Sequence, residues 1–287
     1  MHPLIQTALD KTGDTTTIQS ATSVQGGSIN ESFRVETEAS VYFIKYHEAA
    51  PERFFELEAK GLELIRNTGT INAPLAFTYQ DKPGESFLVL EWIEGRETKG
   101  TQAVLGEKLA ALHSTSAEQH GFHDNTYIGL LDQPNDLYDN WLSYYRDKRL
   151  GGQLDYGIHH GTITGHRRDL LEKLLTRLET WIPENVTPSP LHGDLWGGNW
   201  LAGPGGEPYL IDPSFLYGDR YFELAFTELF GGFSKSFYDA YAANAPISSD
   251  YETVKPLYQL YYLLVHLNIF GEMYGARVDE VLERYVG

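Results

Sequence analysis

The chain has 287 residues, no cysteine and a formal net charge of -18. Nucleic acids and anionic membranes bind clusters of Lys and Arg, so this charge argues against both as partners. The lack of cysteine excludes disulfides, thiolate metal sites and a cysteine nucleophile. We see no basic leader segment and no long apolar run, which favours a soluble, cytoplasmic protein. The length is enough for a core divided between two lobes.

The first 93 residues predict a β-rich lobe. We expect a short helix at 4–10 and strands near 15–20, 32–36, 41–45, 75–79 and 86–92. Between the first two strands lies a glycine-rich turn that includes Gly26, Gly27 and Ser28. Glycine lets backbone N–H groups approach a ligand closely, so such a turn can fold over phosphates. A pair of glycines by itself favours a plain hairpin turn instead, and no Walker A sequence follows.

A lysine and a glutamate predict an ion pair in this lobe. Lys45 ends the strand at 41–45, where a kinase places the lysine that binds the α- and β-phosphates. In the helix expected at 52–67, Glu58 falls in the middle of an apolar face. A buried carboxylate is unfavourable unless it is paired, so we expect Glu58 to pair with Lys45. A solvent-facing lysine at a strand end is the alternative.

Residues 94–287 predict a mostly helical second lobe. The polar stretch after Ile93 separates the lobes, and adenine would bind between them against backbone groups from Glu91 to Ile93. The expected helices cover residues 101–113, 137–150, 165–182, 234–244 and 252–270, with a short one from residue 279. The loop after the first of these helices carries His120, His123 and Asp124. These residues could bind a metal, although nothing in the sequence fixes their geometry.

The strongest chemical signal lies just before residue 200. Asp194 lies between His192 and Asn199 in the spacing His-x-Asp-x-x-x-x-Asn, and a short apolar strand then leads to Asp212. Phosphoryl transfer requires a carboxylate that accepts the proton of the attacking hydroxyl, and oxygen ligands that hold Mg²⁺ against the phosphates of ATP. Asp194 fits the first task, and Asn199 and Asp212 fit the second. His-x-Asp alone also occurs in turns and in metal-dependent hydrolases, so the prediction of a phosphotransferase rests on the complete set.

The sequence also resembles a known family over nearly its whole length. The matching segments are 26–30, 43–45, 58–62, 105–113, 127–129, 149–150, 192–199, 212–213, 217–220, 223–225 and 228–233. The most specific are His-Gly-Asp-Leu-Trp at 192–196 and Phe-Gly-Gly-Phe at 230–233. In these segments the chain is similar to the fructosamine kinases (ketosamine-3-kinases), which are relatives of the aminoglycoside and choline kinases.

The resemblance implies a two-lobed, protein-kinase-like α+β fold, with a β-rich N-lobe and a mostly helical C-lobe, and the use of ATP and Mg²⁺. It implies phosphorylation of the 3-hydroxyl of a ketosamine, the glycation product of a small amine or of a protein. The 3-phosphate then breaks down and frees the amine, which amounts to deglycation and protein repair.

The resemblance also implies roles by position. It makes Asp194 the catalytic base, Asn199 and Asp212 the Mg²⁺ ligands, and Lys45 with Glu58 the phosphate-binding pair. On the substrate side it places Trp196, Tyr217 and Asp219. An aromatic face such as that of Trp196 suits the C–H groups of a sugar.

The chain departs from the family pattern at three positions. Ser28 stands where several members have cysteine, so a thiol switch is not available there. Glu223 replaces an aspartate of many bacterial members and Tyr221 a glutamate, and the longer Glu223 could shift how the catalytic loop is braced.

Two alternatives remain beside the ketosamine kinase. One is a kinase of another small hydroxyl compound, such as an aminoglycoside, choline or homoserine. The other is a kinase-like binding module without catalysis, against which the intact set of Lys45, Asp194, Asn199 and Asp212 argues.

Overall fold

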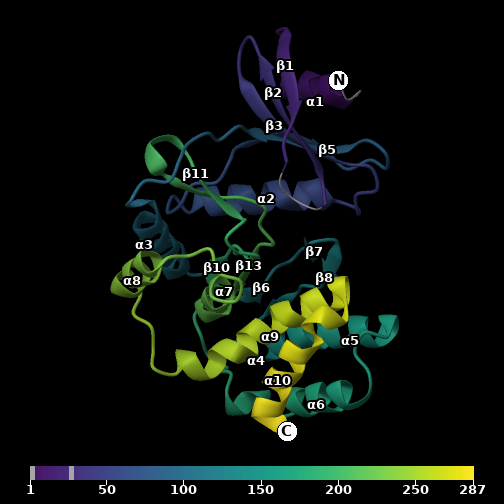
Figure 1. Cartoon of the computed structure of the whole chain (residues 1–287), viewed down its shortest axis with the longest axis vertical. Helices are drawn as coiled ribbons and strands as arrows, with labels where there is room; N and C mark the ends of the chain where they lie inside the picture. Colours follow the sequence, from purple (N-terminus) through teal and green to yellow (C-terminus); the bar gives the residue numbers. More distant parts are fainter. Residues whose placement is uncertain (1–3, 26–28) are drawn as a thin grey trace.

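The computed structural model describes residues 4–25 and 29–287. The chain folds into a β-rich N-lobe and a mostly helical C-lobe (Figure 1). Our predicted boundary after residue 93 falls between the last N-lobe strand and the first C-lobe helix. The predicted phosphate-loop residues Gly26, Gly27 and Ser28 lie outside the described residues. Within the described part of the chain, no helix is long and apolar enough to cross a membrane.

The N-lobe is built on an antiparallel sheet with the strand order β1-β2-β3-β5-β4. Its elements are α1 (Leu4–Thr12), β1 (Ile18–Ser23), β2 (Glu31–Thr37), β3 (Val41–His47), α2 (Phe54–Asn67), β4 (Ala76–Gln80) and β5 (Ser86–Glu91). Buried residues of α1, such as Ile5 and Leu9, pack with Ile44 and Val89 of the central strands in a small core. The lobe therefore has the strands and the long helix that the sequence predicts.

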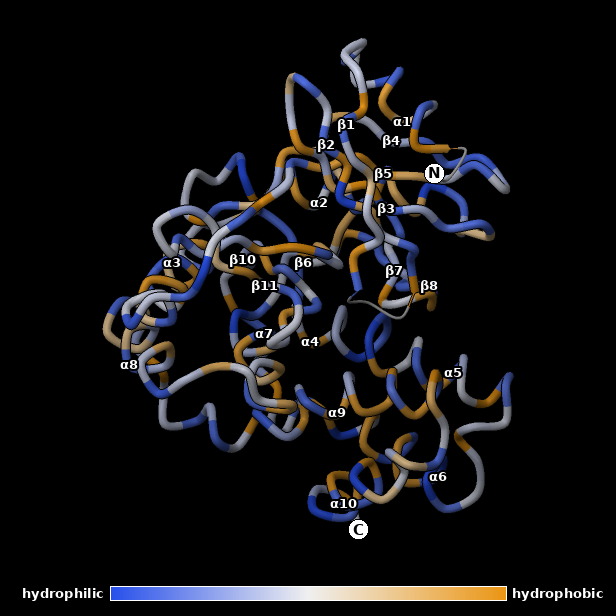
Figure 2. Tube along the Cα trace, turned by 45° about the horizontal axis from the view of Figure 1, so that its top comes forward, coloured by the Kyte–Doolittle hydropathy of each residue, from blue (hydrophilic) through white to orange (hydrophobic). Residues whose placement is uncertain are grey.

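The C-lobe surrounds a larger core that α9 crosses; α9 and β5 are among the most hydrophobic segments in Figure 2. Its helices are α3 (Thr101–Ser114), α4 (Trp141–Tyr144), η1 (Tyr145–Leu150), α5 (Gly151–His160), α6 (Gly165–Leu175), η2 (Leu178–Thr180), η3 (Pro204–Gly206), α7 (Arg220–Thr227), α8 (Lys235–Asn244), α9 (Tyr251–Phe270), η4 (Glu272–Tyr274) and α10 (Gly275–Val286). Its short strands are β6 (His120–Gly121), β7 (Thr126–Ile128), β8 (Leu131–Gln133), β9 (Leu137–Tyr138), β10 (Ser189–Leu191), β11 (Trp200–Ala202), β12 (Pro208–Leu210) and β13 (Leu216–Gly218).

Short strand pairs bring the two predicted catalytic segments side by side. β10 pairs with β13, and β11 pairs with β12, so the segments 192–199 and 211–215 must run next to each other. Two backbone bonds join them directly: the N–H of Ser214 donates to the carbonyl of His192 at 2.8 Å, and that of Ile211 to the carbonyl of Asn199 at 3.0 Å. This crossing of two hairpin-like pairs positions the site.

Two helices differ from their predicted extent. The helix expected at 137–150 begins later, passes through the π-helical turn η1 and continues into α5, which the sequence analysis missed. Gly151 and Gly152 disfavour a helix on propensity alone, but packing of α5 against α9 and α6 overrides that preference. The helix expected at 165–182 ends at Leu175, because Arg177 leaves the helical region, while Leu178 and Ile182 still reach the core.

The close packing of α3 against α8 can be tested at Gly106. A Cβ at Gly106 would lie 2.1 Å from the carbonyl oxygen of Phe237, whereas a Cβ at Gly152 of α5 would meet nothing within 4 Å. We expect Gly106→Ala to lower the free energy of unfolding by about 1–3 kcal/mol through overpacking. Gly152→Ala, the matched control, should raise it by up to about 1 kcal/mol through helix propensity. Urea unfolding measures both, and equal effects would contradict the close packing.

Candidate active site

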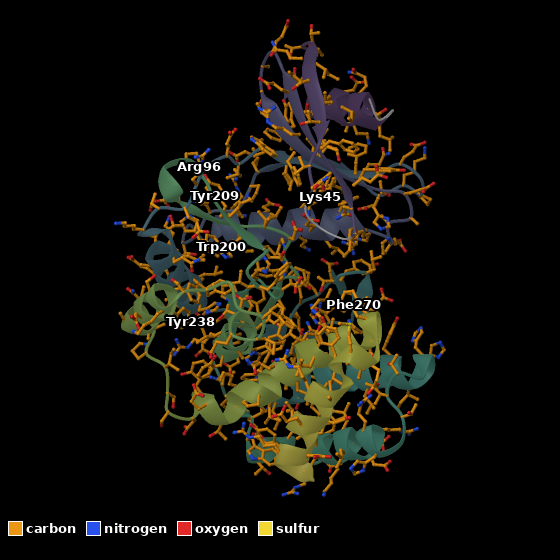
Figure 3. The ribbon with its side chains drawn as sticks, in the orientation of Figure 1. Lys45, Arg96, Trp200, Tyr209, Tyr238 and Phe270 are labelled. Atoms are coloured by element: carbon orange, nitrogen blue, oxygen red, sulfur yellow. The ribbon has the colours of Figure 1, made fainter. Side chains whose placement is uncertain are left out.

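Eight of the predicted site residues line a cleft of about 840 Å³ between the lobes. Figure 3 shows Lys45 in the N-lobe and Phe270 at the end of α9 that lies nearest to it. The residues that the sequence analysis selected and that line this cleft are Lys45, Glu58, Glu91, Ile93, Asp194, Trp196, Asn199 and Asp212. Val24, Ile29 and Asn30, which flank the undescribed glycine-rich turn, line it as well. Tertiary folding therefore gathers segments that are far apart in the sequence around one cavity.

Lys45 forms the expected ion pair and also a second one. Its Nζ lies 2.7 Å from Glu58 Oε1 and 2.5 Å from Asp212 Oδ1. Phe55, Leu62 and the rest of the apolar face of α2 are buried, and this orientation points Glu58 into the cleft.

The charges of this group depend on one another. Burial acts to lower the pKa of Lys45, but the adjacent carboxylates of Asp212 and Glu58 outweigh it and raise the pKa, so the lysine stays cationic. Burial has the opposite effect on Glu58 and raises its pKa, because it disfavours the charged carboxylate. The cation of Lys45 acts against this increase. The result is a cation fixed between two carboxylates in the cleft.

His192 ties the catalytic loop to the strand that precedes Asp212. It is fully buried, and its Nε2 lies 2.7 Å from the carbonyl of Ile211 while its Nδ1 accepts the N–H of Asp194 at 3.2 Å. One nitrogen donates and the other accepts, which is the pattern of a neutral imidazole. Burial also lowers the pKa of His192. His192 therefore shapes the loop and does not supply a charge.

Asp194 lies at the point where a proton acceptor is expected. The Nδ2 of Asn199 donates to the backbone carbonyl of Asp194 at 2.8 Å and to the Oδ2 of Asp194 at 3.2 Å. Burial, followed by the negative charge of Asp212, raises the pKa of Asp194 to about 8. A carboxylate with a raised pKa is a stronger base, which suits removal of a proton from a hydroxyl.

Glu223 binds the backbone of the loop that leads to Asp194. It is fully buried in α7, and its carboxylate accepts the N–H groups of His192 at 3.2 Å and of Gly193 at 2.6 Å. On the other side it lies 2.9 Å from His113 Nε2. Burial acts to raise the pKa of Glu223, but His113 and the N–H donors outweigh it and lower the pKa, so the carboxylate stays ionised. His113 therefore acts as a structural partner of Glu223.

Gly193 is a position in the loop where a side chain cannot fit. Its φ is +85°, and a Cβ there would lie 2.0 Å from the carbonyl oxygen of Ser214. The hydroxyl of Tyr262 donates to its carbonyl at 3.0 Å. The backbone of Gly193 is thus held by Glu223 on its N–H and by Tyr262 on its C=O, immediately before the catalytic residue.

The side-chain oxygens of Asn199 and Asp212 are suitable ligands for a magnesium ion. The Nδ2 of Asn199 is used on Asp194, so its Oδ1 can turn toward a cation together with the carboxylate of Asp212. Asp212 has a φ of 57°, a strained value for a non-glycine residue that often marks a functional site. No cluster of three or more His, Asp or Glu suited to a metal is found among residues 4–25 and 29–287. A site with few protein ligands is typical of Mg²⁺ bound with nucleotide phosphates.

The whole sequence matches a known family. The profile described as fructosamine kinase matches residues 1–287. The chain belongs to the fructosamine kinase family. It is 36% identical over 263 residues to a protein named "probable ketoamine kinase" from Enterococcus faecium, covering 91% of this chain and 94% of that protein. It is 35% identical over 283 residues to the chloroplastic protein-ribulosamine 3-kinase of Arabidopsis thaliana, covering 96% and 85%.

Solved structures agree with this family. A crystal structure assigned as a fructosamine-3-kinase from Haemophilus somnus is 28% identical, has a TM-score of 0.87, and covers 98% of this chain and 96% of its own. A choline kinase from Streptococcus pneumoniae, at 17% identity and a TM-score of 0.65, covers 98% of both chains and shares the fold. This member of the fructosamine kinase family therefore has the two-lobed, kinase-like α+β fold that its sequence predicts.

Two predicted substrate residues of this fructosamine kinase lie elsewhere. Tyr217 and Asp219 are not among the residues that line the cleft. Asp219 is buried, caps the N-terminus of α7 through the N–H of Tyr221 at 2.9 Å, and accepts the hydroxyl of Tyr258 at 2.6 Å. Tyr217 pairs within the sheet of β10 and β13 and packs against Phe215. Their motif follows Asp212 in sequence, but β13 places both residues outside the described lining of the cleft.

The sequence analysis missed an aromatic end of the cleft. Phe230, His266, Phe270 and Tyr274 are among the residues that line it. The sequence places Phe230 within a family motif and predicts only a helix at 252–270. A polar His266 within the apolar run of that helix was the signal that could have identified a ligand-facing position.

An ion-pair network fixes α2 against the C-lobe. Arg53 Nη1 lies 2.9 Å from Asp124 Oδ1, and Lys60 Nζ lies 2.5 Å from Asp124 Oδ2. The hydroxyl of Tyr127 also donates to the carbonyl of Glu52 at 3.0 Å. Asp124 is therefore not a metal ligand here but a contact that holds the helix that carries Glu58.

We expect Asp124→Asn to reduce the kcat/KM for ATP by about 3- to 10-fold, because α2 loses two charged contacts of modest strength. Asp279→Asn is the matched control. It weakens the ion pair of Asp279 on α10 with Arg167 on α6, within the C-lobe, and should leave the kinetics unchanged. Steady-state kinetics with varied ATP measures both variants, and an effect of equal size in the two would show that general stability, not the position of α2, is responsible.

Proposed function

We propose that this protein is an ATP-dependent kinase that phosphorylates the 3-hydroxyl of ketosamines in the cytoplasm and so begins their deglycation. The observation that carries the proposal is the convergence of Lys45, Asp194, Asn199 and Asp212 in one cleft of a chain that belongs to the fructosamine kinase family. The names of its relatives, ketoamine kinase and protein-ribulosamine 3-kinase, support a ketosamine as the acceptor.

The nucleotide would occupy the side of the cleft formed by the N-lobe. Glu91 and Ile93 end β5 and begin the connection to the C-lobe, and both line the cleft, so their backbone groups can bind the adenine edge. Lys45, kept cationic by its two carboxylate partners, is suited to bind the phosphates. Asn199 and Asp212 would hold Mg²⁺, which neutralises negative charge on the phosphates when it is bound. These local cations offset the acidic character of the chain where ATP must bind.

Asp194 would act on the acceptor hydroxyl. Its carboxylate takes the proton as the sugar oxygen forms a bond to the γ-phosphorus, and the bond from that phosphorus to the bridging oxygen of ADP breaks. Glu223 and Tyr262 fix the loop so that Asp194 keeps this orientation without a large rearrangement. Trp196, two residues further on and 44% exposed, offers an aromatic face to the sugar ring or chain.

The acceptor test compares ATP consumption with a ribulosamine, a fructosamine, choline and an aminoglycoside, all in the presence of Mg²⁺. We expect turnover with the ketosamines alone. Asp194→Asn should lower that turnover by about 100-fold or more, because a positioned base is lost, and should keep the KM for ATP nearly unchanged. Asp239→Asn, an exposed aspartate on α8, is the control. Turnover with choline or the aminoglycoside alone would contradict the acceptor, and normal turnover of Asp194→Asn would contradict the role of the base.

Metal dependence is a separate prediction. Removal of Mg²⁺ by EDTA should abolish turnover, and re-addition should restore it. Asp212→Asn should raise the Mg²⁺ concentration needed for half-maximal rate by about tenfold or more, because a hard cation loses an anionic oxygen ligand. Asp239→Asn should titrate like the wild type. Full activity in EDTA, or an unchanged Mg²⁺ titration of Asp212→Asn, would contradict the assignment of this ligand.

A further inference from the structure

The acceptor end of the cleft is closed by an aromatic wall, which we define as Phe230, His266, Phe270 and Tyr274. The four rings pack on one another: the ring centroid of His266 lies 4.7 Å from that of Phe230, 5.0 Å from that of Tyr274 and 5.6 Å from that of Phe270. All four residues line the cleft. The wall comes from the segment after α7, the last turns of α9, and η4, and Figure 3 shows Phe270 at the end of α9 nearest to the N-lobe.

The wall adjoins the catalytic loop directly. Tyr262 lies one helical turn before His266 in α9, and its hydroxyl donates to the carbonyl of Gly193. Gly193 precedes the catalytic residue Asp194 in the chain. A Cβ at Gly197, three residues after Asp194, would lie 2.9 Å from the Cα of Gly232, so the segment that carries Phe230 lies beside the loop of Asp194.

His266 presents a hydrogen-bond acceptor within this wall. Its Nδ1 lies 2.8 Å from the carbonyl of Tyr262. A carbonyl can only accept, so this nitrogen carries the proton. Burial lowers the pKa of the imidazole, which keeps the ring neutral and leaves a lone pair on Nε2. No described residue bonds to this Nε2, although the side chain lines the cleft.

The wall is apolar and partly open to solvent. Phe270 is 55% exposed and Phe230 is 39% exposed. The carboxylates among the described lining residues are Glu58, Glu91, Asp194 and Asp212, and none belongs to the wall. Exposed aromatic faces next to a catalytic base are suited to contact a ligand. They attract cations through the ring faces and pack on alkyl groups through their area.

We propose that the aromatic wall is the subsite for the amine half of the acceptor, a protonated N-alkyl amine whose N–H donates to Nε2 of His266. This inference rests on the proposed function and deepens it. In a ketosamine the nitrogen is attached to C1 and the phosphorylated oxygen to C3, so the amine must lie close to the group that contacts Asp194. The alkyl carbons beyond the nitrogen pack against Phe230 and Phe270, which favours aliphatic carriers such as a lysine side chain.

The test uses two substrates that share one sugar and one alkyl chain. One is the N-alkyl ketosamine, and the other is its 1-O-alkyl ether, in which oxygen replaces the amine nitrogen and removes both the charge and the N–H. We expect the wild type to prefer the amine by about 10- to 100-fold in kcat/KM, the effect of a hydrogen bond to a charged group. His266→Phe should reduce this preference to about threefold or less while the KM for ATP stays unchanged.

Two further variants complete the design. His266→Gln, which keeps an acceptor, should restore part of the preference for the amine. His159→Phe, at an exposed histidine of α5 outside the described cleft lining, should behave like the wild type. Phe270→Ala should weaken the gain in kcat/KM on lengthening the alkyl chain from methyl to butyl, whereas Phe270→Leu should keep most of it.

The outcomes separate this inference from the proposed function. Absence of turnover with every ketosamine, while ATP still binds, would overturn both. Equal turnover of amine and ether by the wild type would overturn the amine subsite and leave the kinase in place. A preference for the amine that persists in His266→Phe would also overturn the amine subsite. An equal loss of kcat/KM with the amine and the ether, together with a lowered melting temperature, would overturn it as well, because His266 would then act only in folding.

Discussion

The buried carboxylate of Glu223 fixes the loop on which the chemistry depends. A fully buried charge is unfavourable unless donors surround it, and here the donors are the N–H groups of His192 and Gly193 together with His113. The same contacts that stabilise Glu223 therefore determine the path of the backbone just before Asp194. Because α7 carries Glu223 and α9 carries Tyr262, the packing of two helices is converted into the position of one catalytic carboxylate.

The N-lobe solves a different electrostatic problem. ATP is an anion, and the chain has a net charge of -18. Lys45 remains cationic because Glu58 and Asp212 lie beside it, and Asp212 is also suited to Mg²⁺. The position of Glu58 depends in turn on α2, which Asp124 joins to the C-lobe through Arg53. The field at the phosphates is thus set by a few fixed pairs and not by the overall charge.

The cleft has two chemically distinct ends. One part carries the charged groups of Lys45, Glu58 and Asp212, and we propose that it binds the nucleotide, whereas the part proposed to bind the acceptor has the rings of Phe230 and Phe270 beside His266. In the proposed reaction, Asp194 accepts the proton of the acceptor hydroxyl that attacks the γ-phosphate of the nucleotide. This division suits the proposed reaction, in which ATP transfers a phosphoryl group to a ketosamine. The polar sugar of the acceptor would then lie near Asp194, and its aliphatic amine would lie against the aromatic rings.

The sequence by itself determined the fold class, the strands and α2 of the N-lobe, and the set of Lys45, Glu58, Asp194 and Asn199, because periodicity and motif spacing are local properties. The family resemblance implied that Tyr217 and Asp219 lie on the substrate side, but neither lines the described cleft, and α5 was not predicted because glycines disfavour a helix. Only the tertiary structure decided these points, since β13 turns the motif into the sheet and packing on α9 forms α5. Only the structure also showed which backbone groups Glu223 binds and that His266 faces the cleft, because contacts between distant segments leave no local signal.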